Sequence, residues 1–173
     1  MLSLNKTVTG PEPITLEEAK AWMRVDGATD DALITSLITQ ARELTENYLN
    51  ISIVETTLVL TASERKELVL PYGPVSSITS CVDMEDEPVS YDWNGFYMSF
   101  DQGAYSVTGG SSIYVQTITT YEAGTATIPA GLKLGLLEVI LWLYENRTDV
   151  SGIQMMLSYN TNLQIYRMNN VWI

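Results

Sequence analysis

The segment that decides the fold, residues 128–147, reads IPAGLKLGLLEVILWLYENR. Pro129 suits the first turn of a helix, because its missing N–H would have no partner there. Apolar residues then occupy almost the whole circumference of the helix, which is typical of a buried helix. The apolar run is too short and too often interrupted by charge to span a membrane. We therefore expect this helix to be the centre of the core, with Leu137 and Trp142 buried.

Two further helices are predicted upstream of this segment. A capping-box pattern, Thr15 followed by Glu18, opens a helix at about 15–24 that points Trp22 inward. A second helix, at about 29–50, starts with acidic residues that the positive end of the helix dipole stabilises. Its apolar residues repeat at helical spacing, which indicates one wide packing face.

Beyond Ile51 the hydrophobic period changes from 3.6 to 2, and β-branched residues become frequent. We expect about six or seven strands between residues 53 and 121. Asn94–Gly95 is the strongest hairpin signal, because both residues accept a positive φ. Two short helical pieces are expected after the long helix, at 153–157 and 162–168.

These patterns predict an α+β fold, in which a small helical bundle of three main helices carries an inserted antiparallel β region. We expect a single domain over residues 1–173, with a helical core at 14–50 and 128–147 and the β insertion at 51–127. The first 14 residues are predicted to be irregular or a short edge strand.

Composition excludes several function classes. The chain has 173 residues, a formal net charge of −12, no histidine and a single cysteine. Without histidine, neither Ser-His-Asp nor Cys-His catalysis is available, and multi-cysteine metal sites are absent. The acidic balance opposes binding to nucleic acid through phosphate contacts. No signal peptide is visible at the N-terminus.

Four acidic residues lie together in a predicted turn: Asp83, Glu85, Asp86 and Glu87. They do not follow the EF-hand pattern, so a solvated turn is favoured over a Ca²⁺ site. The span between Glu67 and Leu132 contains eight acidic residues and no Lys or Arg. This part of the β region therefore carries only negative charge.

The sequence gives little support for glycosidase activity or for carbohydrate binding. Glu138 and Glu145 lie two helical turns apart, roughly 10 Å, which is wider than either glycosidase mechanism uses. Trp22 and Trp142 occupy helical positions where a core role is favoured over a carbohydrate platform. We expect no enzyme activity, no cofactor and no metal.

Four segments nevertheless resemble a known family in sequence and order: ITLEEAKAWMRVD, TDDALITSLITQARELTENYL, LPYGPVSSITS and IPAGLKLGLLEVILWLYENR. They are similar to the head–tail connector (adaptor) proteins of tailed bacteriophages. The resemblance covers residues 14–50, 68–80 and 128–147. It implies a small helical core with an inserted β part, which assembles as a ring of about a dozen copies under the portal vertex.

By that resemblance, the protein is a structural virion protein at the head–tail interface, assembled in the host cytoplasm. Its implied partners are the portal protein, a downstream connector or tail-completion protein, and other copies of itself. DNA would pass through the ring without specific binding. Because the span from Glu67 to Leu132 lacks a compensating cation, Asp83, Glu85, Asp86 and Glu87 are the candidate channel-facing acids, and the alternative is that they face outward and keep the ring soluble. No membrane contact is expected.

The C-terminal stretch departs from the family pattern, because it continues well beyond the long helix. Its aromatic and apolar residues indicate a partner interface at Tyr166, Arg167, Trp172 and Ile173. Two alternatives stay open at this point: a different virion binding module, such as a tail or adhesin domain, and a carboxylate-based hydrolase.

Overall fold

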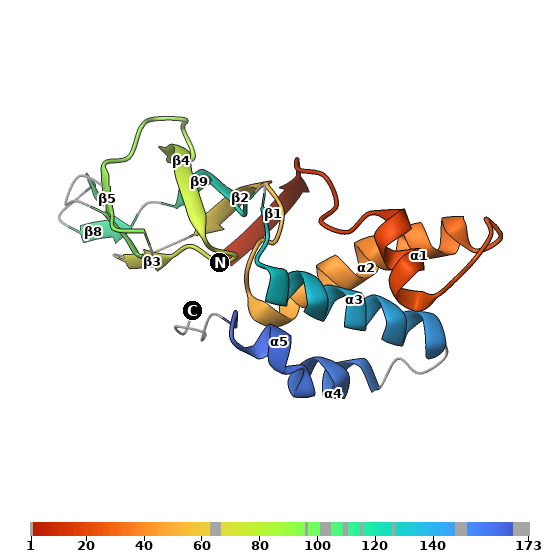
Figure 1. Cartoon of the computed structure of the whole chain (residues 1–173). Helices are drawn as coiled ribbons and strands as arrows, with labels where there is room; N and C mark the ends of the chain where they lie inside the picture. The colour runs from red at the N-terminus through yellow and green to blue at the C-terminus, as the bar shows by residue number, and fades with distance from the viewer. Residues whose placement is uncertain are drawn as a thin grey trace. The chain divides into compact units, whose positions relative to one another are not determined.

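The computed structural model describes residues 2–62, 67–95, 97–100, 105–108, 111–114, 116–125, 127–147 and 152–167. Within them it contains five helices and nine strands, and the strand pairs are antiparallel (Figure 1). The α+β class predicted from the sequence is therefore confirmed. The described residues divide into a helical unit, residues 11–54 and 127–167, and a sheet unit, residues 2–10 and 55–125.

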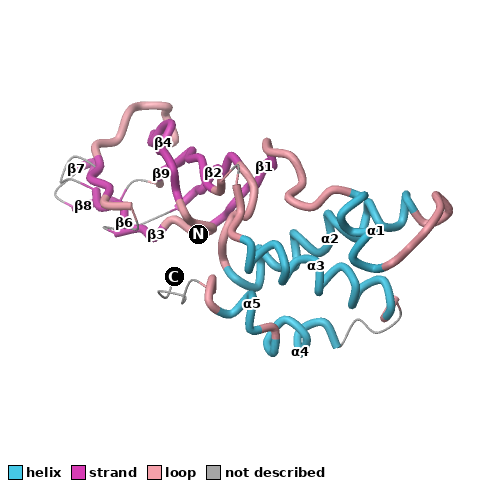
Figure 2. The backbone as a smooth tube through the Cα atoms, viewed as in Figure 1, coloured by secondary structure: helices cyan, strands magenta, loops and turns pink. Residues whose placement is uncertain are grey.

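The helical unit contains α1 (Leu16–Met23), α2 (Asp31–Leu49), α3 (Ala130–Glu145), α4 (Gly152–Tyr159) and α5 (Thr161–Gln164), which Figure 2 shows in cyan. The first three lie where the sequence predicts the main helices, and α4 and α5 lie near the two expected short pieces. Because α4 and α1 both have eight residues, the structure does not single out three main helices.

Helix α1 begins with the predicted capping box. Thr15 Oγ1 accepts a hydrogen bond from the Glu18 N–H at 3.2 Å, and the Glu18 carboxylate accepts one from the Thr15 N–H at 3.0 Å. The inward orientation predicted for Trp22 is wrong, because 42% of this residue is exposed. Ala19 is the fully buried residue of α1, whereas the core leaves Trp22 largely in contact with solvent.

Helix α3 has one fully buried face. Its buried residues are Leu132, Gly135, Leu136, Val139 and Ile140. Leu137 and Trp142 contact the core but stay partly exposed. The prediction of a helix buried nearly all round holds in part: one face is fully buried, and the remaining residues from 131 to 144 are half-buried rather than exposed.

The sheet unit is built on four strands, β1 (Leu2–Val8), β2 (Thr56–Ala62), β9 (Thr117–Ala123) and β4 (Val75–Val82), in the order β1-β2-β9-β4. Burial alternates strictly along β2 and β9, as period-2 patterning predicts. Tyr121 lies fully buried in this core and donates a hydrogen bond to the Pro71 carbonyl at 2.8 Å. Burial raises the pKa of this phenol.

Three shorter strands, β3 (Glu67–Val69), β6 (Tyr97–Phe100) and β5 (Tyr91–Trp93), form a second sheet in the order β3-β6-β5. A separate hairpin joins β7 (Tyr105–Thr108) and β8 (Ser111–Tyr114). The predicted Asn94–Gly95 turn connects β5 to β6: Gly95 has a φ of +96°, and Asn94 Oδ1 accepts from the Tyr97 N–H at 2.9 Å.

Candidate functional site

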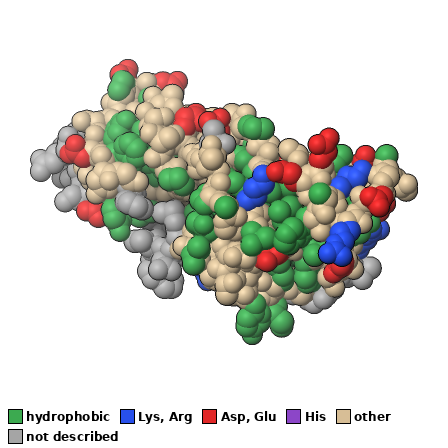
Figure 3. Space-filling model, in the orientation of Figure 1, with side chains coloured by type: hydrophobic (Ala, Val, Ile, Leu, Met, Phe, Trp, Pro, Cys, Tyr) green, Lys and Arg blue, Asp and Glu red, His purple; other side chains and the backbone are tan. Residues whose placement is uncertain are grey.

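The described surface with the most exposed large apolar side chains lies on α4 and just after α5. Met155 is 64% exposed, Tyr159 is 78% exposed and Ile165 is 75% exposed. We call these three residues the α4–α5 patch. In Figure 3, hydrophobic side chains project from the lower edge of the helical unit, where Figure 1 shows α4. Exposed apolar side chains that form a continuous surface are typical of interaction sites, which makes this segment a candidate.

The spacing of residues on α4 explains why the patch is exposed. Ile153 and Leu157, four positions apart, are buried against the helical core. Met155 and Tyr159 are also four positions apart, so they share another face of the same helix. Apolar residues thus lie on two sides of α4, and only one of these sides packs against the core.

The segment that carries Ile165 is held firmly against α3. The side chain of Leu163 fills the space beside Gly135, where an added Cβ would lie 2.4 Å from Leu163 Cδ2. Asn160 caps α5 and donates to Glu138 Oε2 at 2.8 Å. Glu138 is therefore engaged in packing α5, not in a paired-carboxylate site with Glu145. The patch is displayed by a well-anchored segment.

Two of the predicted interface residues pack on their own helical unit. Tyr166 is partly buried against the core, and its hydroxyl oxygen lies 3.1 Å from where a Cβ at Gly131 would be. Arg167 is exposed, and its guanidinium lies over the ring of Tyr48, 4.9 Å from the centroid. Trp172 and Ile173, the other two predicted residues, lie outside the described residues.

The predicted acidic cluster forms the turn after β4. Asp83 Oδ1 accepts from the N–H groups of Glu85 at 2.9 Å and Glu87 at 3.0 Å, so this carboxylate shapes the turn. Glu85, Asp86 and Glu87 are exposed. The structure thus brings all four residues together, with Asp83 in an organising role and the other three in contact with solvent.

No group of three or more metal-ligating side chains is found in the part of the chain that the structure describes. No described helix has the length and apolar content needed to cross a bilayer. The single cysteine, Cys81, is buried, and burial raises the pKa of its thiol, which leaves it poorly suited to nucleophilic chemistry.

The α4–α5 patch was not among the residues predicted from the sequence. The signal that could have found it is the excess of apolar residues in α4, which carries more of them than one buried face requires. The prediction of a C-terminal interface placed it instead on residues 166–173, a few positions further along.

Comparison with known proteins finds a matching family model and solved structures of similar fold. Residues 12–155 match the family model of the head completion protein (HCP) family. The fold is similar to a chain in the neck of an empty GTA particle computed with C6 symmetry, with a TM-score of 0.73, 17% identity, and coverage of 98% of this chain and 97% of that one. It is also similar to a chain in the virion of a native gene transfer agent (GTA) particle, with a TM-score of 0.72, 19% identity and the same coverage. A chain in the neck of a native GTA particle computed with C12 symmetry matches with a TM-score of 0.72, 17% identity and the same coverage. No curated protein sequence matches the chain.

Proposed function

The chain belongs to the head completion protein family, and from this membership we propose that it is a ring-forming connector subunit of a virion. In this proposal the ring extends the portal channel for DNA passage and joins the head to the tail. The role is structural and involves no catalysis. The protein resides at the head–tail interface after assembly in the host cytoplasm.

Ring formation is supported by the symmetry of the similar particles, since neck reconstructions with C6 and C12 symmetry contain chains of this fold. A closed ring requires heterologous contacts, in which one surface of a subunit binds a different surface of the next. The partly exposed apolar side of α3, opposite its buried face, offers one such surface. The resemblance to connector proteins implies a ring of about a dozen copies, and a chain of similar fold comes from a neck computed with C12 symmetry.

The observation that carries the proposal is the α4–α5 patch. Met and Tyr are enriched at protein interfaces, and the three apolar residues stand on a segment fixed to α3 by Leu163 and Asn160. We propose that this patch contacts the portal protein, together with the interface residues predicted from the sequence, Tyr166, Arg167, Trp172 and Ile173. The opposite end of the ring would receive the downstream connector or tail-completion protein.

DNA would pass through the ring without binding to it. A net charge of −12 per chain amounts to on the order of −140 for a dozen copies, which repels phosphate groups. We propose Asp83, Glu85, Asp86 and Glu87 as acids that face the channel. On the face shown in Figure 3, the coloured part of the sheet unit displays acidic side chains and no basic ones.

The test compares assembly of patch variants with that of a matched control. M155S/Y159S/I165S removes the apolar surface and leaves the buried residues of α4 untouched. We expect the variant to keep the melting temperature of the wild type but to lose its complex with purified portal protein, as seen by negative-stain microscopy and size-exclusion chromatography.

The control is M84S, which removes an exposed methionine from the acidic turn, 56% exposed and far from α4 in sequence. It should assemble like the wild type. Wild-type protein that forms neither rings nor portal complexes would contradict the proposed function. Portal binding by the triple variant at wild-type strength would instead contradict the role of the patch.

A further inference from the structure

The C-terminal end of α1 displays an aromatic side chain that the helical core does not use. Trp22 is 42% exposed, and it is not among the partly buried residues that pack against the core of the helical unit. Its neighbour Ala21 is exposed as well. A single exposed apolar residue is ordinary on a protein surface, so the meaning of Trp22 depends on what surrounds it.

The residue two positions further on, Arg24, is an exposed cation without a partner. It forms no ion pair, side-chain hydrogen bond or ring contact with any residue that the structure describes. The other described cations of the helical unit are all engaged in ion pairs or over a tyrosine ring: Lys20, Arg42, Lys133, Arg147 and Arg167. Within the described part of this unit, Arg24 alone has its charge uncompensated.

The backbone of Arg24 shows that local folding does not explain the choice of arginine. Arg24 ends α1 in the left-handed region, with a φ of 56°. Its N–H donates to the Ala21 carbonyl, and the Val25 N–H donates to the Lys20 carbonyl at 3.0 Å. Glycine is the usual residue at such a helix end, and asparagine follows, as at Asn50 after α2. A side chain with a Cβ crowds the backbone there, so another requirement retains the guanidinium.

Helix α1 holds the indole and the guanidinium in a fixed place. Near its end, Lys20 donates to the Gly27 carbonyl and forms an ion pair with Asp31 of α2. Near its beginning, Glu18 forms an ion pair with Lys133 of α3. A docking surface that is already rigid loses little conformational entropy when it binds.

The chemistry of these two side chains indicates what kind of surface they fit. Tryptophan and arginine are enriched among the residues that dominate binding energy at protein interfaces. A cation without a counter-charge favours an acidic partner. Other copies of this chain meet that requirement, because the chain has 21 acidic residues and 9 basic ones.

The charge of Arg24 also indicates how two copies would meet. A two-fold contact places the same surface of both copies together, which would bring two Arg24 cations close to each other. A head-to-tail contact instead places Arg24 against a different, acidic surface of the next copy. Contacts of this second kind close into rings.

We propose that Trp22 and Arg24 form one side of the contact between neighbouring subunits of the ring. The next subunit covers the indole, and its carboxylates accept charge-assisted hydrogen bonds from the guanidinium. This inference rests on the proposed connector function and deepens it, because it names residues of the subunit contact. The portal contact proposed for the α4–α5 patch does not depend on it.

The test compares ring assembly of full-length variants by native mass spectrometry and negative-stain microscopy, with and without portal protein. Because glycine suits a φ of 56°, R24G should keep or raise the melting temperature while it removes the guanidinium. We expect R24G and W22S each to raise the protein concentration needed for rings about tenfold or more. R24K keeps the charge and should assemble better than R24G, and R24E should form no rings.

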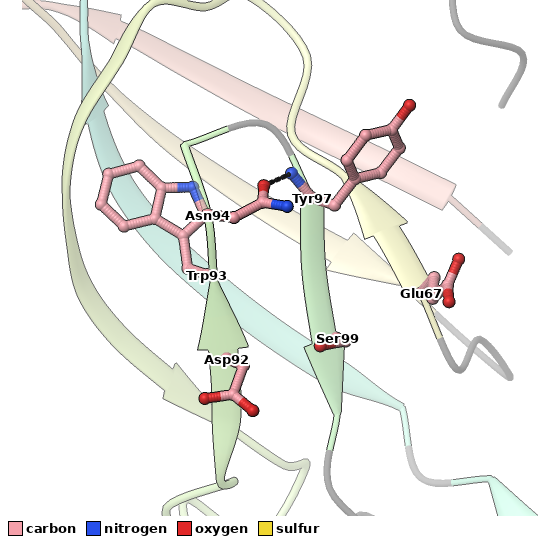
Figure 4. A pocket seen from close by; sticks show the side chains of 6 residues that line it. All are labelled: Glu67, Asp92, Trp93, Asn94, Tyr97 and Ser99. Carbon is pink, nitrogen blue, oxygen red and sulfur yellow. Dashed lines mark hydrogen bonds between the residues drawn. The ribbon is translucent and has the colours of Figure 1, made fainter.

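A mixing experiment separates a lost contact from a damaged fold. R24G keeps the acidic surface that the next subunit offers, so an equimolar mixture with the wild type should contain mixed pairs. The matched control is Y97S, because Tyr97 is 40% exposed and borders a pocket in the sheet unit (Figure 4). Y97S should assemble like the wild type.

The outcomes distinguish this inference from the proposed function. Rings of R24G at the wild-type concentration, or rings of R24E, would overturn the inference and leave the connector function intact. An equal loss of rings in Y97S would also overturn it. Wild-type protein that forms no rings, with or without portal protein, would instead contradict the proposed function.

Discussion

Arg42 and Glu46 form an ion pair inside the helical unit, with Arg42 Nη1 2.9 Å from Glu46 Oε2 and both side chains almost inaccessible to water. Glu46 Oε1 also accepts from the Ile53 N–H at 2.8 Å, and Arg42 Nε donates to Glu12 at 2.9 Å. Burial disfavours the charged guanidinium, yet the hydrogen bond and charge of Glu12 and the charge of Glu46 together raise the pKa of Arg42. The pair thus fixes α2 to the segments before α1 and after α2.

The first prediction concerns this pair. Replacing Glu46 with Gln leaves the Arg42 charge buried with less compensation, and removing one partner of a buried ion pair costs about 3–5 kcal/mol. E46Q should lower the free energy of unfolding by an amount of that order in urea denaturation. The control is E43Q, because Glu43 is 61% exposed and lies 3.8 Å from the same guanidinium. An equal effect of the two substitutions would show that burial of the pair has no special energetic role.

The second prediction concerns pH. The hydrogen bond from Lys133 is the main reason why the pKa of Glu18 is below its ordinary value of 4.5. Because the folded-state pKa is the lower one, Glu18 adds stability above the unfolded-state pKa, and this is lost as the pH falls through the folded-state pKa. In K133M the pKa of Glu18, followed by carboxyl NMR, should rise toward 4.5.

The stability change in K133M should stay below about 1 kcal/mol, because both partners are substantially exposed. K20M removes a lysine from a different pair, Lys20–Asp31, and should leave the Glu18 titration unchanged. An unshifted Glu18 titration in K133M would show that this pair does not form in solution.

The third prediction separates the two sides of α3. Leu136 is 1% exposed at the centre of the helical core, so Leu136→Ala should cost about 2–5 kcal/mol. Leu137→Ala and Trp142→Ala should cost less in the isolated chain, because these side chains are only partly buried. Thermal unfolding of the three variants measures the order. Equal losses would mean that α3 is as fully surrounded as its sequence suggests.

The sequence predicts local structure better than it predicts burial. The capping box of Thr15 and the Asn94–Gly95 turn are read from neighbouring residues, and both are confirmed. The resemblance to head–tail connector proteins is confirmed by the family match. The exposure of Trp22 depends instead on which helices cover α1, and no local pattern encodes that.

The burial of residues in the candidate sites was equally hard to predict from the sequence. Arg42 and Glu46, four positions apart, have the spacing of an ordinary surface pair on a helix, so their burial is invisible in the sequence. The register of β3 and β6 brings Glu67 beside Ser99, a residue from a distant part of the sequence. Met155 and Tyr159 look like core residues until the buried face of α4 is known.

The fourth prediction concerns the packing of α5. An added Cβ at Gly135 would lie 2.4 Å from Cδ2 and 2.8 Å from Cγ of Leu163. Gly135→Ala should gain up to about 1 kcal/mol of helix propensity but lose about 1–3 kcal/mol through overpacking. We expect net destabilisation and faster hydrogen exchange in α5. A more stable G135A protein would show that α5 adjusts without loss of contacts.

The last prediction addresses the acidic turn under the proposed channel role. Asp83 must be kept, because its carboxylate accepts two backbone hydrogen bonds that shape the turn. The informative variant is therefore E85K/D86K/E87K, which reverses the charge of the three exposed acids. If these acids face passing DNA, the lysines would attract phosphates, and DNA ejection from assembled particles should slow.

The effect should be strongest at low salt, because screening acts beyond a Debye length of ~8 Å at physiological ionic strength. The matched control E17K/D26K/E145K reverses three exposed acids of the helical unit and adds the same charge. If only the turn variant slows ejection, the acids of the turn act on DNA in the bore. If both variants slow it equally, net charge alone is responsible, and if particles with the turn variant eject normally at every salt concentration, the turn lies outside the channel.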